Sequence, residues 1–311
     1  MATDLASFGA ALDALRARVE ADLGPRDVRY VEQVDKLSRW LERIGRGWVI
    51  ASGGPVGFFG GVTCLWIGKQ LQATEIGHAA LHGAYDRFPE AAKFHAHAFR
   101  WRIPIDEELW TDLHNVRHHP HTNIIGKDPG VGNLPVNRHD KTLATLGVIA
   151  KALRKATPYY AREYLVLPAF AGPMWWKALL GNALSELARD LYSIAALYAG
   201  HDGHDVAYFP EGVKAESRAD WYRMQVEATN NFAVPLPFSI LCGGLDLHIE
   251  HHLFPKLPPH RLREIAPEVR RVCEEHGVAY KIDGWGKTLR KVFRQLRRGV
   301  PLHGRGIVRA A

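Results

Sequence analysis

Eight histidines gather in three short stretches of the chain, and this clustering constrains the fold more than any other feature. The stretches run over residues 78–82, 114–119 and 248–252 and cover 16 residues in total. An even spread of the 17 histidines would place about one histidine there. The clustered residues are His78, His82, His114, His118, His119, His248, His251 and His252. Chance is therefore a poor explanation for the pattern.

The spacing within each stretch suits metal binding from helices. Residues three and four apart lie on one face of an α-helix. His78 and His82 can thus aim two imidazoles at one point, as can His114 and His118, and the histidines of 248–252 form a compact arc. Together they exceed the four ligands that zinc normally takes, and imidazole-rich ligation suits iron. We therefore predict a site for two iron ions.

Other metal sites and a purely structural role are less well supported. An isolated HxxxH pair is usually an ordinary core or surface feature, but three clusters in one chain are not. The zinc-protease pattern HExxH is absent. The cysteines, Cys64, Cys242 and Cys273, are odd in number and form no CxxC, which argues against a disulfide framework or a thiolate site and favours a reducing compartment. Glu250 is expected on the far side of its helix, towards solvent or hydrogen-bonded to a ligand.

Apolar runs between the histidine stretches indicate a membrane protein, although the mean hydropathy is only −0.19. Residues 47–68 carry no charge and just suit one bilayer crossing, unless Pro55 splits them. Glycines 53, 57 and 61 recur every four residues there, as at a close helix–helix contact. A second run covers 164–176, and a third, 232–245, is too short to span.

Charged residues add two expectations. Glu186, Arg189 and Asp190 interrupt the apolar stretch 178–200, so they are expected to face a protein interior or to pair. The net charge of +7 and pI near 9.3 fit anionic lipid or nucleic acid. The helix predicted at 287–298 has a basic side and an apolar side, which favours an anionic cytoplasmic leaflet. We find no nucleic-acid recognition motif and predict no such partner.

The histidine stretches with their flanks resemble the membrane fatty acid desaturase family, in particular its bacterial acyl-lipid and acyl-CoA branch. The matching segments are EIGHAALHGAYD (75–86), HNVRHHPHTNIIGKD (114–128) and GGLDLHIEHHLFPKLP (243–258), within a similarity that covers roughly 40–298. The resemblance implies an all-α integral membrane bundle with a cytoplasmic helical cap that holds a dimetal site. It also implies a multi-pass protein of the bacterial inner membrane with its active site facing the cytoplasm.

Three segments follow from this resemblance. Residues 1–46 would form N-terminal cytoplasmic helices, broken at Gly24-Pro25. Residues 47–256 would form the membrane core with the histidine stretches. Residues 257–311 would form a C-terminal cytoplasmic cap with the basic helix.

The resemblance also implies a ninth ligand, His201, which stands where the family has a Gly-His pair. His204 follows within three residues and is the alternative. The predicted metal ligands are His78, His82, His114, His118, His119, His201, His248, His251 and His252. The candidates for orienting these imidazoles are the carboxylates of Glu75, Asp112, Asp128, Asp202 and Glu250, and Asn230 or Asn231 acting through a bound water. No catalytic residue separate from the metal ligands is expected.

The implied reaction uses dioxygen and two external electrons to introduce a double bond into a long acyl chain. The acyl chain would be carried by a lipid, coenzyme A or acyl carrier protein, and a ferredoxin, rubredoxin or cytochrome would supply electrons. Two alternatives stay open: a related diiron lipid hydroxylase, epoxygenase or acetylenase, and a non-catalytic metal- or lipid-binding membrane protein.

Overall fold

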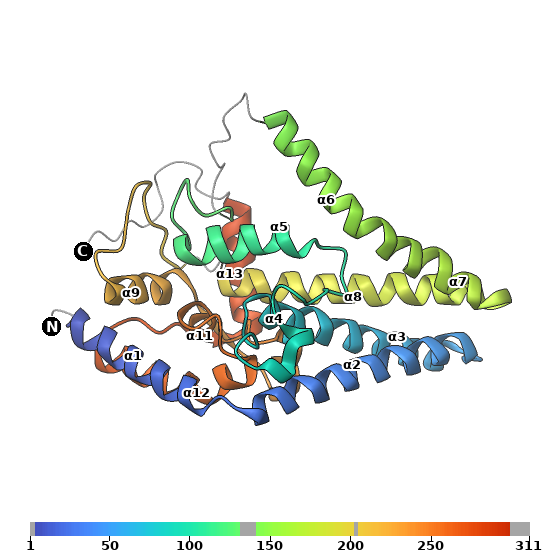
Figure 1. Ribbon diagram of the computed structural model, residues 1–311, viewed down its shortest axis with the longest axis horizontal. Helices are drawn as coiled ribbons and strands as arrows, with labels where there is room; N and C mark the ends of the chain where they lie inside the picture. Colours follow the sequence, from blue (N-terminus) through green and yellow to red (C-terminus); the bar gives the residue numbers. More distant parts are fainter. Residues whose placement is uncertain (1–3, 131–140, 202–204, 299–311) are drawn as a thin grey trace. The chain divides into compact units, whose positions relative to one another are not determined.

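The computed structural model describes residues 4–130, 141–201 and 205–298, and these residues are mostly helical (Figure 1). They pack as two compact units built from non-contiguous segments. The first unit comprises Met1–Gly24, Thr111–Asn137 and Ala195–Ala311, and the second comprises Pro25–Trp110 and Arg138–Ile194. The helical fold class is confirmed. The division at residues 46 and 256 rests on membrane topology and stays a prediction.

The first unit contains the second and third histidine stretches. Its elements are α1 (Leu5–Asp22), the π-helix η3 (Asp112–His118), the 3₁₀ turn η4 (His119–His121), the end of α8 (Trp175–His201), α9 (Arg218–Ala228), β1 (Asn231–Ala233), α10 (Leu236–Cys242), α11 (His248–Leu253), α12 (Pro259–Glu275), β2 (Ile282–Gly284) and α13 (Trp285–Arg298). The strands β1 and β2 pair in parallel, with Asn231 opposite Ile282.

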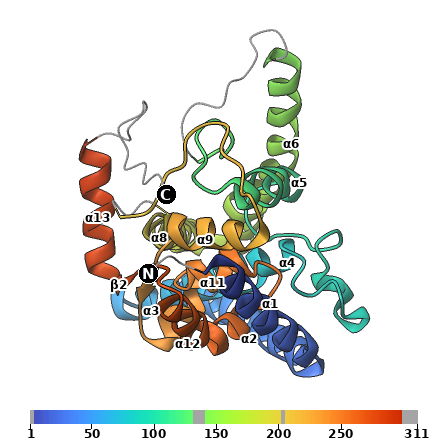
Figure 2. The same cartoon turned by 90° about the vertical axis from the view of Figure 1, so that its left-hand side faces the viewer.

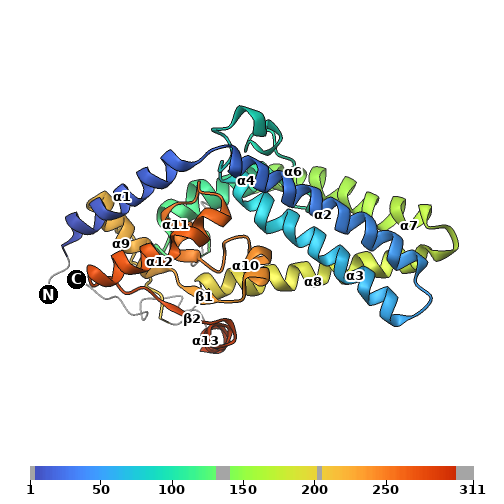
Figure 3. The same cartoon turned by 90° about the horizontal axis from the view of Figure 1, so that it is seen from below.

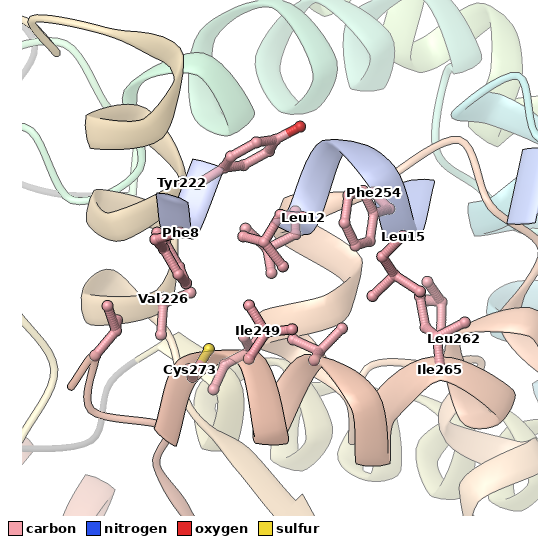
Figure 4. Packing of buried hydrophobic residues seen from close by; sticks show 14 of the residues in the cluster. Phe8, Leu12, Leu15, Tyr222, Val226, Ile249, Phe254, Leu262, Ile265 and Cys273 are labelled. Atoms are coloured by element: carbon pink, nitrogen blue, oxygen red, sulfur yellow. The ribbon is translucent and has the colours of Figure 1, made fainter. Parts of the chain in front are cut away.

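An apolar core holds α1, α9, α11 and α12 together (Figure 4). Leu12, Leu15 and Val19 of α1 are all buried in it. Ile249 enters the same core from α11 and has no exposed surface. The N-terminal helix therefore supports, across this core, the helix that carries the third histidine stretch.

The second unit contains the first histidine stretch. Its elements are α2 (Pro25–Ala51), α3 (Pro55–Leu71), the π-helix η1 (Gln72–His78), α4 (Ala79–Leu81), the 3₁₀ helix η2 (Pro89–Phe94), α5 (Glu107–Thr111), α6 (Lys141–Ala161), the π-helix η5 (Arg162–Val166), α7 (Leu167–Phe170), the 3₁₀ turn η6 (Gly172–Met174) and most of α8. The break predicted at Gly24-Pro25 is confirmed, since α2 begins at Pro25.

The run 47–68 folds as a hairpin and not as one crossing. The helix α2 ends at Ala51 and α3 begins at Pro55, so the two helices lie side by side (Figure 3). The expected glycine contact is closest at Gly61, where a Cβ would lie 2.7 Å from the backbone nitrogen of Val49, and it is looser at Gly57, where a Cβ would lie 3.4 Å from Nε1 of Trp48. Gly53 has nothing within 4 Å of its Cβ position, because it falls in the turn. The predicted split at Pro55 is confirmed.

The other apolar runs do not form continuous long helices either. Residues 164–176 are divided by a turn at Gly172, whose φ is +55°. Residues 232–245 hold β1 and the short α10, in keeping with the expectation that they do not span. Among the described residues, no helix is both long and apolar enough to traverse a bilayer.

Of the charges within 178–200, Glu186 and Arg189 face the interior of the second unit, as predicted, whereas Asp190 is exposed and pairs with Arg189 at 2.9 Å. Glu186 and Arg189 are about 5 % exposed. Lys69 donates to Glu186 at 2.8 Å and lies 3.4 Å from Glu163, which also accepts from Arg46 at 2.8 Å. Each buried charge thus has an opposite partner, which offsets the cost of its desolvation.

Candidate metal centre

The second histidine stretch is held on a π-helix, which changes which side chains meet. In η3 the backbone bonds run from i to i+5, so residues five apart approach one another. His114 and His119 accordingly meet, with 3.2 Å between their Nε2 atoms. The predicted i, i+4 pair also forms, because the rings of His114 and His118 stack at 5.3 Å. The π-turn therefore brings three imidazoles together where an α-helix would bring two.

The third stretch occupies α11, and the end of α8 packs against it. His248, His251 and His252 are at most 3 % exposed. His201, the last residue of α8, places its Nε2 2.7 Å from Nε2 of His248. A Cβ on Gly200 would lie 2.5 Å from the His248 ring. Glycine at position 200 therefore allows the two helices to bring His201 and His248 together.

His118 is oriented by a buried carboxylate. Its Nδ1 lies 3.0 Å from both oxygens of Asp128. Asp128 has no exposed surface and also accepts from the backbone nitrogens of Asn123 and Gly130, at 2.7 and 2.8 Å. Because a carboxylate only accepts, Nδ1 carries the proton and Nε2 keeps its lone pair. His118 Nε2 is buried and has no hydrogen-bond partner among the described residues.

His252 is held in the same way by neutral groups. Its Nδ1 lies 3.0 Å from Oε1 of Gln225 and 3.1 Å from Oγ1 of Thr122. Burial, followed by the neighbouring histidines, lowers the pKa of His252 well below its usual value. The imidazole is therefore neutral at physiological pH, as a metal ligand must be. Its Nε2 is buried with no partner among the described residues.

Two overlapping groups of imidazoles in the first unit could each hold a metal ion. The ligand atoms of His118, His201 and His252 lie within 4.8 Å of one another, and so do those of His119, His251 and His252. Imidazole nitrogens suit first-row metals such as iron and zinc. Nδ1 held by an acceptor and Nε2 left bare is the usual arrangement of a metal-binding histidine. These residues therefore fit a metal centre.

The first histidine stretch lies in the second unit. His78 and His82 meet edge to face with 4.7 Å between ring centroids, and both contact the ring of Trp110 at 5.5 and 5.3 Å. Both histidines are 6 % exposed. Glu75, predicted as an orienting carboxylate, accepts from the hydroxyl of Tyr30 at 2.5 Å.

The other predicted orienting groups have different surroundings. Asp112 is half-exposed and pairs with Arg117 at 2.8 Å. The amide of Asn230 donates to the backbone oxygen of Ala199 at 2.6 Å. His204 and Asp202 lie outside the described residues, so the choice between His201 and His204 stays a prediction.

Glu250 faces neither solvent nor a histidine, so the expectation that its side of α11 is exposed is wrong. It is fully buried and accepts from the amide of Asn231 and the hydroxyl of Tyr280, both at 2.7 Å. Asn231 Oδ1 in turn accepts from the backbone nitrogen of Ile249 at 2.8 Å. Burial raises the pKa of Glu250 to about 7. These bonds hold α11 from the side opposite its ligands.

Sequence reasoning missed Gln225, Thr122 and Tyr280. Thr122 lies inside the segment 114–128 and could have been suspected from that position. Gln225 stands in a helix 27 residues before His252, and nothing in its own stretch of sequence marks it.

Comparison with known proteins finds similarity to fatty acid desaturases. A family model described as "Fatty acid desaturase" matches residues 145–284. An NADPH-dependent stearoyl-CoA 9-desaturase from Mycobacterium tuberculosis is 28 % identical over 92 % of this chain and 79 % of its own length. An sn-1 linoleoyl-lipid 6-desaturase from Synechocystis sp. is 26 % identical over 67 % of this chain and 70 % of its own. Fatty acid desaturase 3 from Bos taurus is 27 % identical over 61 % of this chain and 50 % of its own.

Proposed function

We propose that the chain is a member of the fatty acid desaturase family, to whose members it is similar, and that it introduces a double bond into a long acyl chain at a histidine-ligated diiron site. One observation carries the metal assignment. His118 and His252 each have Nδ1 held by an acceptor and a buried Nε2 without a partner, and both lie in one group with His201. That arrangement presents lone pairs to a metal and serves no other evident purpose.

The proposed ligands are the nine histidines expected from the sequence: His78, His82, His114, His118, His119, His201, His248, His251 and His252. Five of the seven in the first unit (His118, His119, His201, His251 and His252) supply two overlapping groups of ligand atoms. The other two, His114 and His248, lie against His119 and His201, with 3.2 and 2.7 Å between Nε2 atoms. Nitrogen donors in this number exceed what one zinc ion takes, which favours two iron ions. His78 and His82 are included because they form a buried pair with the spacing of ligands.

The chain's own residues have two tasks in this reaction, which are to orient the imidazoles and to exclude water. Two bound irons would supply the four-electron reduction of dioxygen to two waters, for which two electrons and two protons come from outside and two hydrogens come from neighbouring methylenes. Asp128, Gln225 and Thr122 hold the protons on Nδ1 and thereby fix the ring planes. The almost complete burial of α11 excludes water from the imidazoles.

A multi-pass location in a bacterial inner membrane, with the histidines on the cytoplasmic side, is part of the proposal. Its support is the apolar surface of the second unit. Large apolar side chains are exposed along α2, α3, α6 and α8, and such surfaces mark lipid or protein contacts. Examples are Trp40 on α2 at 59 %, Phe59 on α3 at 57 % and Leu191 on α8 at 59 %. Retention of the protein in the membrane pellet after alkaline carbonate extraction would support this location, and release would oppose it.

The substrate carrier and the donor are inferred from relatives. The named relatives act on stearoyl-CoA and on a linoleoyl lipid, so we propose an acyl-CoA or acyl-lipid substrate for this chain. The family resemblance implies two external electrons, which we propose come from a separate ferredoxin, rubredoxin or cytochrome.

The test is fatty acid analysis of cells that express the chain. We expect a new unsaturated species by mass spectrometry, with its double bond placed by derivatisation, and none from His252→Ala. His121→Ala is the matched control. It lies beside the second stretch, with Nδ1 3.0 Å from the backbone oxygen of Arg117, and in none of the metal-binding groups. A hydroxylated product would reassign the reaction, and product from His252→Ala would refute the metal assignment.

A further inference from the structure

The helix α13 has an exposed side that no part of the proposed reaction uses. Its inner side is anchored in the first unit, where Val292 is 4 % exposed and Trp285 stacks on Phe232 at 5.5 Å. Its outer side carries Phe293, which is 62 % exposed. The sequence pattern places Phe293 with the apolar residues of the helix, but the structure turns its ring to the outside. Figure 2 shows α13 next to β2.

Exposed arginines without an ion-pair partner flank that residue along the helix; Arg290 Nε donates only to the backbone oxygen of Gly286 at 3.2 Å. Arg290, Arg294 and Arg297 are exposed and form no ion pair with any described residue. Arg290 and Arg297 stand three and four residues from Phe293, on the same side of the helix, and Arg294 follows Phe293 directly. The two lysines of the helix differ, because both pair with Asp283, Lys287 at 2.6 Å and Lys291 at 2.5 Å. The sequence from Gly284 to Ala311 contains no acidic residue. The outer face of α13 therefore has an excess of positive charge around one apolar ring.

The other amphipathic helix of the first unit has neutralised charges. On α12, Arg270 pairs with Glu274 and Arg271 with Glu275, both at 2.7 Å. An ordinary solvated helix face has this composition, with both signs interspersed. The contrast shows that arginines without an ion-pair partner are specific to α13 and do not simply reflect the positive net charge of the whole chain.

We propose that the outer face of α13 lies on an anionic lipid surface, with Phe293 inserted at the level of the headgroups. Guanidinium groups bind phosphate oxygens in a two-pronged geometry, and an aromatic ring between cations is typical of a helix that lies in the interface plane. An acidic protein would match the charge alone, whereas a lipid surface matches both the charge and the exposed ring. The inference rests on no step of the proposed desaturation and could hold or fail independently of it.

The experiment uses the full chain with one reporter at the proposed contact. Phe293→Cys is combined with Cys64→Ser, so that Cys242 and Cys273, both buried, are the remaining cysteines. An environment-sensitive fluorophore is attached at position 293. The protein is then reconstituted with phosphatidylcholine, with or without about one third phosphatidylglycerol to supply negative charge. We expect a blue shift and quenching by doxyl-lipids only in the anionic membrane.

Charge variants separate the proposal from general attraction. Each basic side chain near an anionic surface strengthens binding about fivefold, so Arg290→Gln with Arg294→Gln should weaken docking about 30-fold and abolish the shift. Arg270→Gln with Arg271→Gln removes the same charge from paired arginines on α12 and should leave the shift intact. Equal spectra in the two lipids would overturn the proposal. So would a shift that appears only when an acidic ferredoxin is added, which would assign this face to a redox partner.

Discussion

At the scale of single residues, the group that holds the far nitrogen of each imidazole decides how firmly a metal is bound. Asp128→Asn keeps the shape of the side chain but removes the charge that holds the proton on Nδ1 of His118. We expect metal affinity to fall roughly 10- to 100-fold, measured by competition with a chromophoric chelator. Asp112→Asn is the control, since Asp112 is half-exposed and pairs only with Arg117 among the described residues. Equal losses in both variants would contradict the orienting role.

Glu250 leads to a prediction about stability. Its carboxyl is fully buried and accepts hydrogen bonds from Tyr280 and Asn231. Tyr280→Phe leaves one carboxyl oxygen of Glu250 without its hydrogen-bond donor. The free energy of unfolding of the metal-free protein, measured by chemical denaturation, should fall by about 1–3 kcal/mol. In a Glu250→Gln background the same change should cost less, because the group left behind is neutral. If the double-mutant cycle gave no coupling energy between Tyr280 and Glu250, the tyrosine would affect stability through another contact.

The sequence could predict candidate site residues only where their spacing along the chain indicates that they lie on one face of a helix. The histidines repeat at helical intervals, and five of those in the first unit form two groups of ligand atoms; the metal-ligand role of all nine stays a prediction. Glu250 was misplaced because helical periodicity gives the direction of a side chain but not what covers it. Here the cover comes from Tyr280 and Asn231, the first of them 30 residues away in sequence. Gln225 could not be predicted for the same reason, because its contact with His252 joins two segments that lie 27 residues apart in sequence.

At the scale of elements, the close approach of α8 to α11 depends on Gly200. A Cβ there would lie 2.5 Å from ring atoms of His248, so one element must move. We expect Gly200→Ala to displace His201 and lower the metal content of the purified protein. Gly47→Ala is the matched control, because nothing lies within 4 Å of its Cβ position in α2. That change should stabilise the helix by roughly 0.4–1 kcal/mol and leave the metal content unchanged.

Helix type and helix ends were predicted less completely than helix positions. The break at Gly24-Pro25 followed from glycine and proline chemistry. The π-helices η1 and η3 did not, because a π-turn is favoured by tertiary contacts and by its side chains' function more than by local propensity. The hairpin of α2 and α3 was hidden because an uncharged run of 22 residues has the length of one crossing.

At the scale of the whole molecule, chain order and packing disagree, and this leads to the last prediction. The helices α1 and α2 are separated by two residues, yet they belong to different units. Leu12 is fully buried among residues of α9, α11 and α12. Leu12→Ala should cost about 2–5 kcal/mol through the cavity that it leaves. Local opening should therefore rise in those helices and not in the adjoining α2.

Hydrogen exchange followed by mass spectrometry measures this directly, with a reciprocal variant as the control. Leu65→Ala perturbs the second unit, where Leu65 packs with Val49 and Val62 between α2 and α3. In the Leu65→Ala variant, faster exchange should be confined to the hairpin of α2 and α3 and to the part of α8 that contains Leu184. If Leu12→Ala instead accelerated exchange in α2 as much as in α11, opening would follow chain order. The third histidine stretch would then not depend on the core to which α1 contributes.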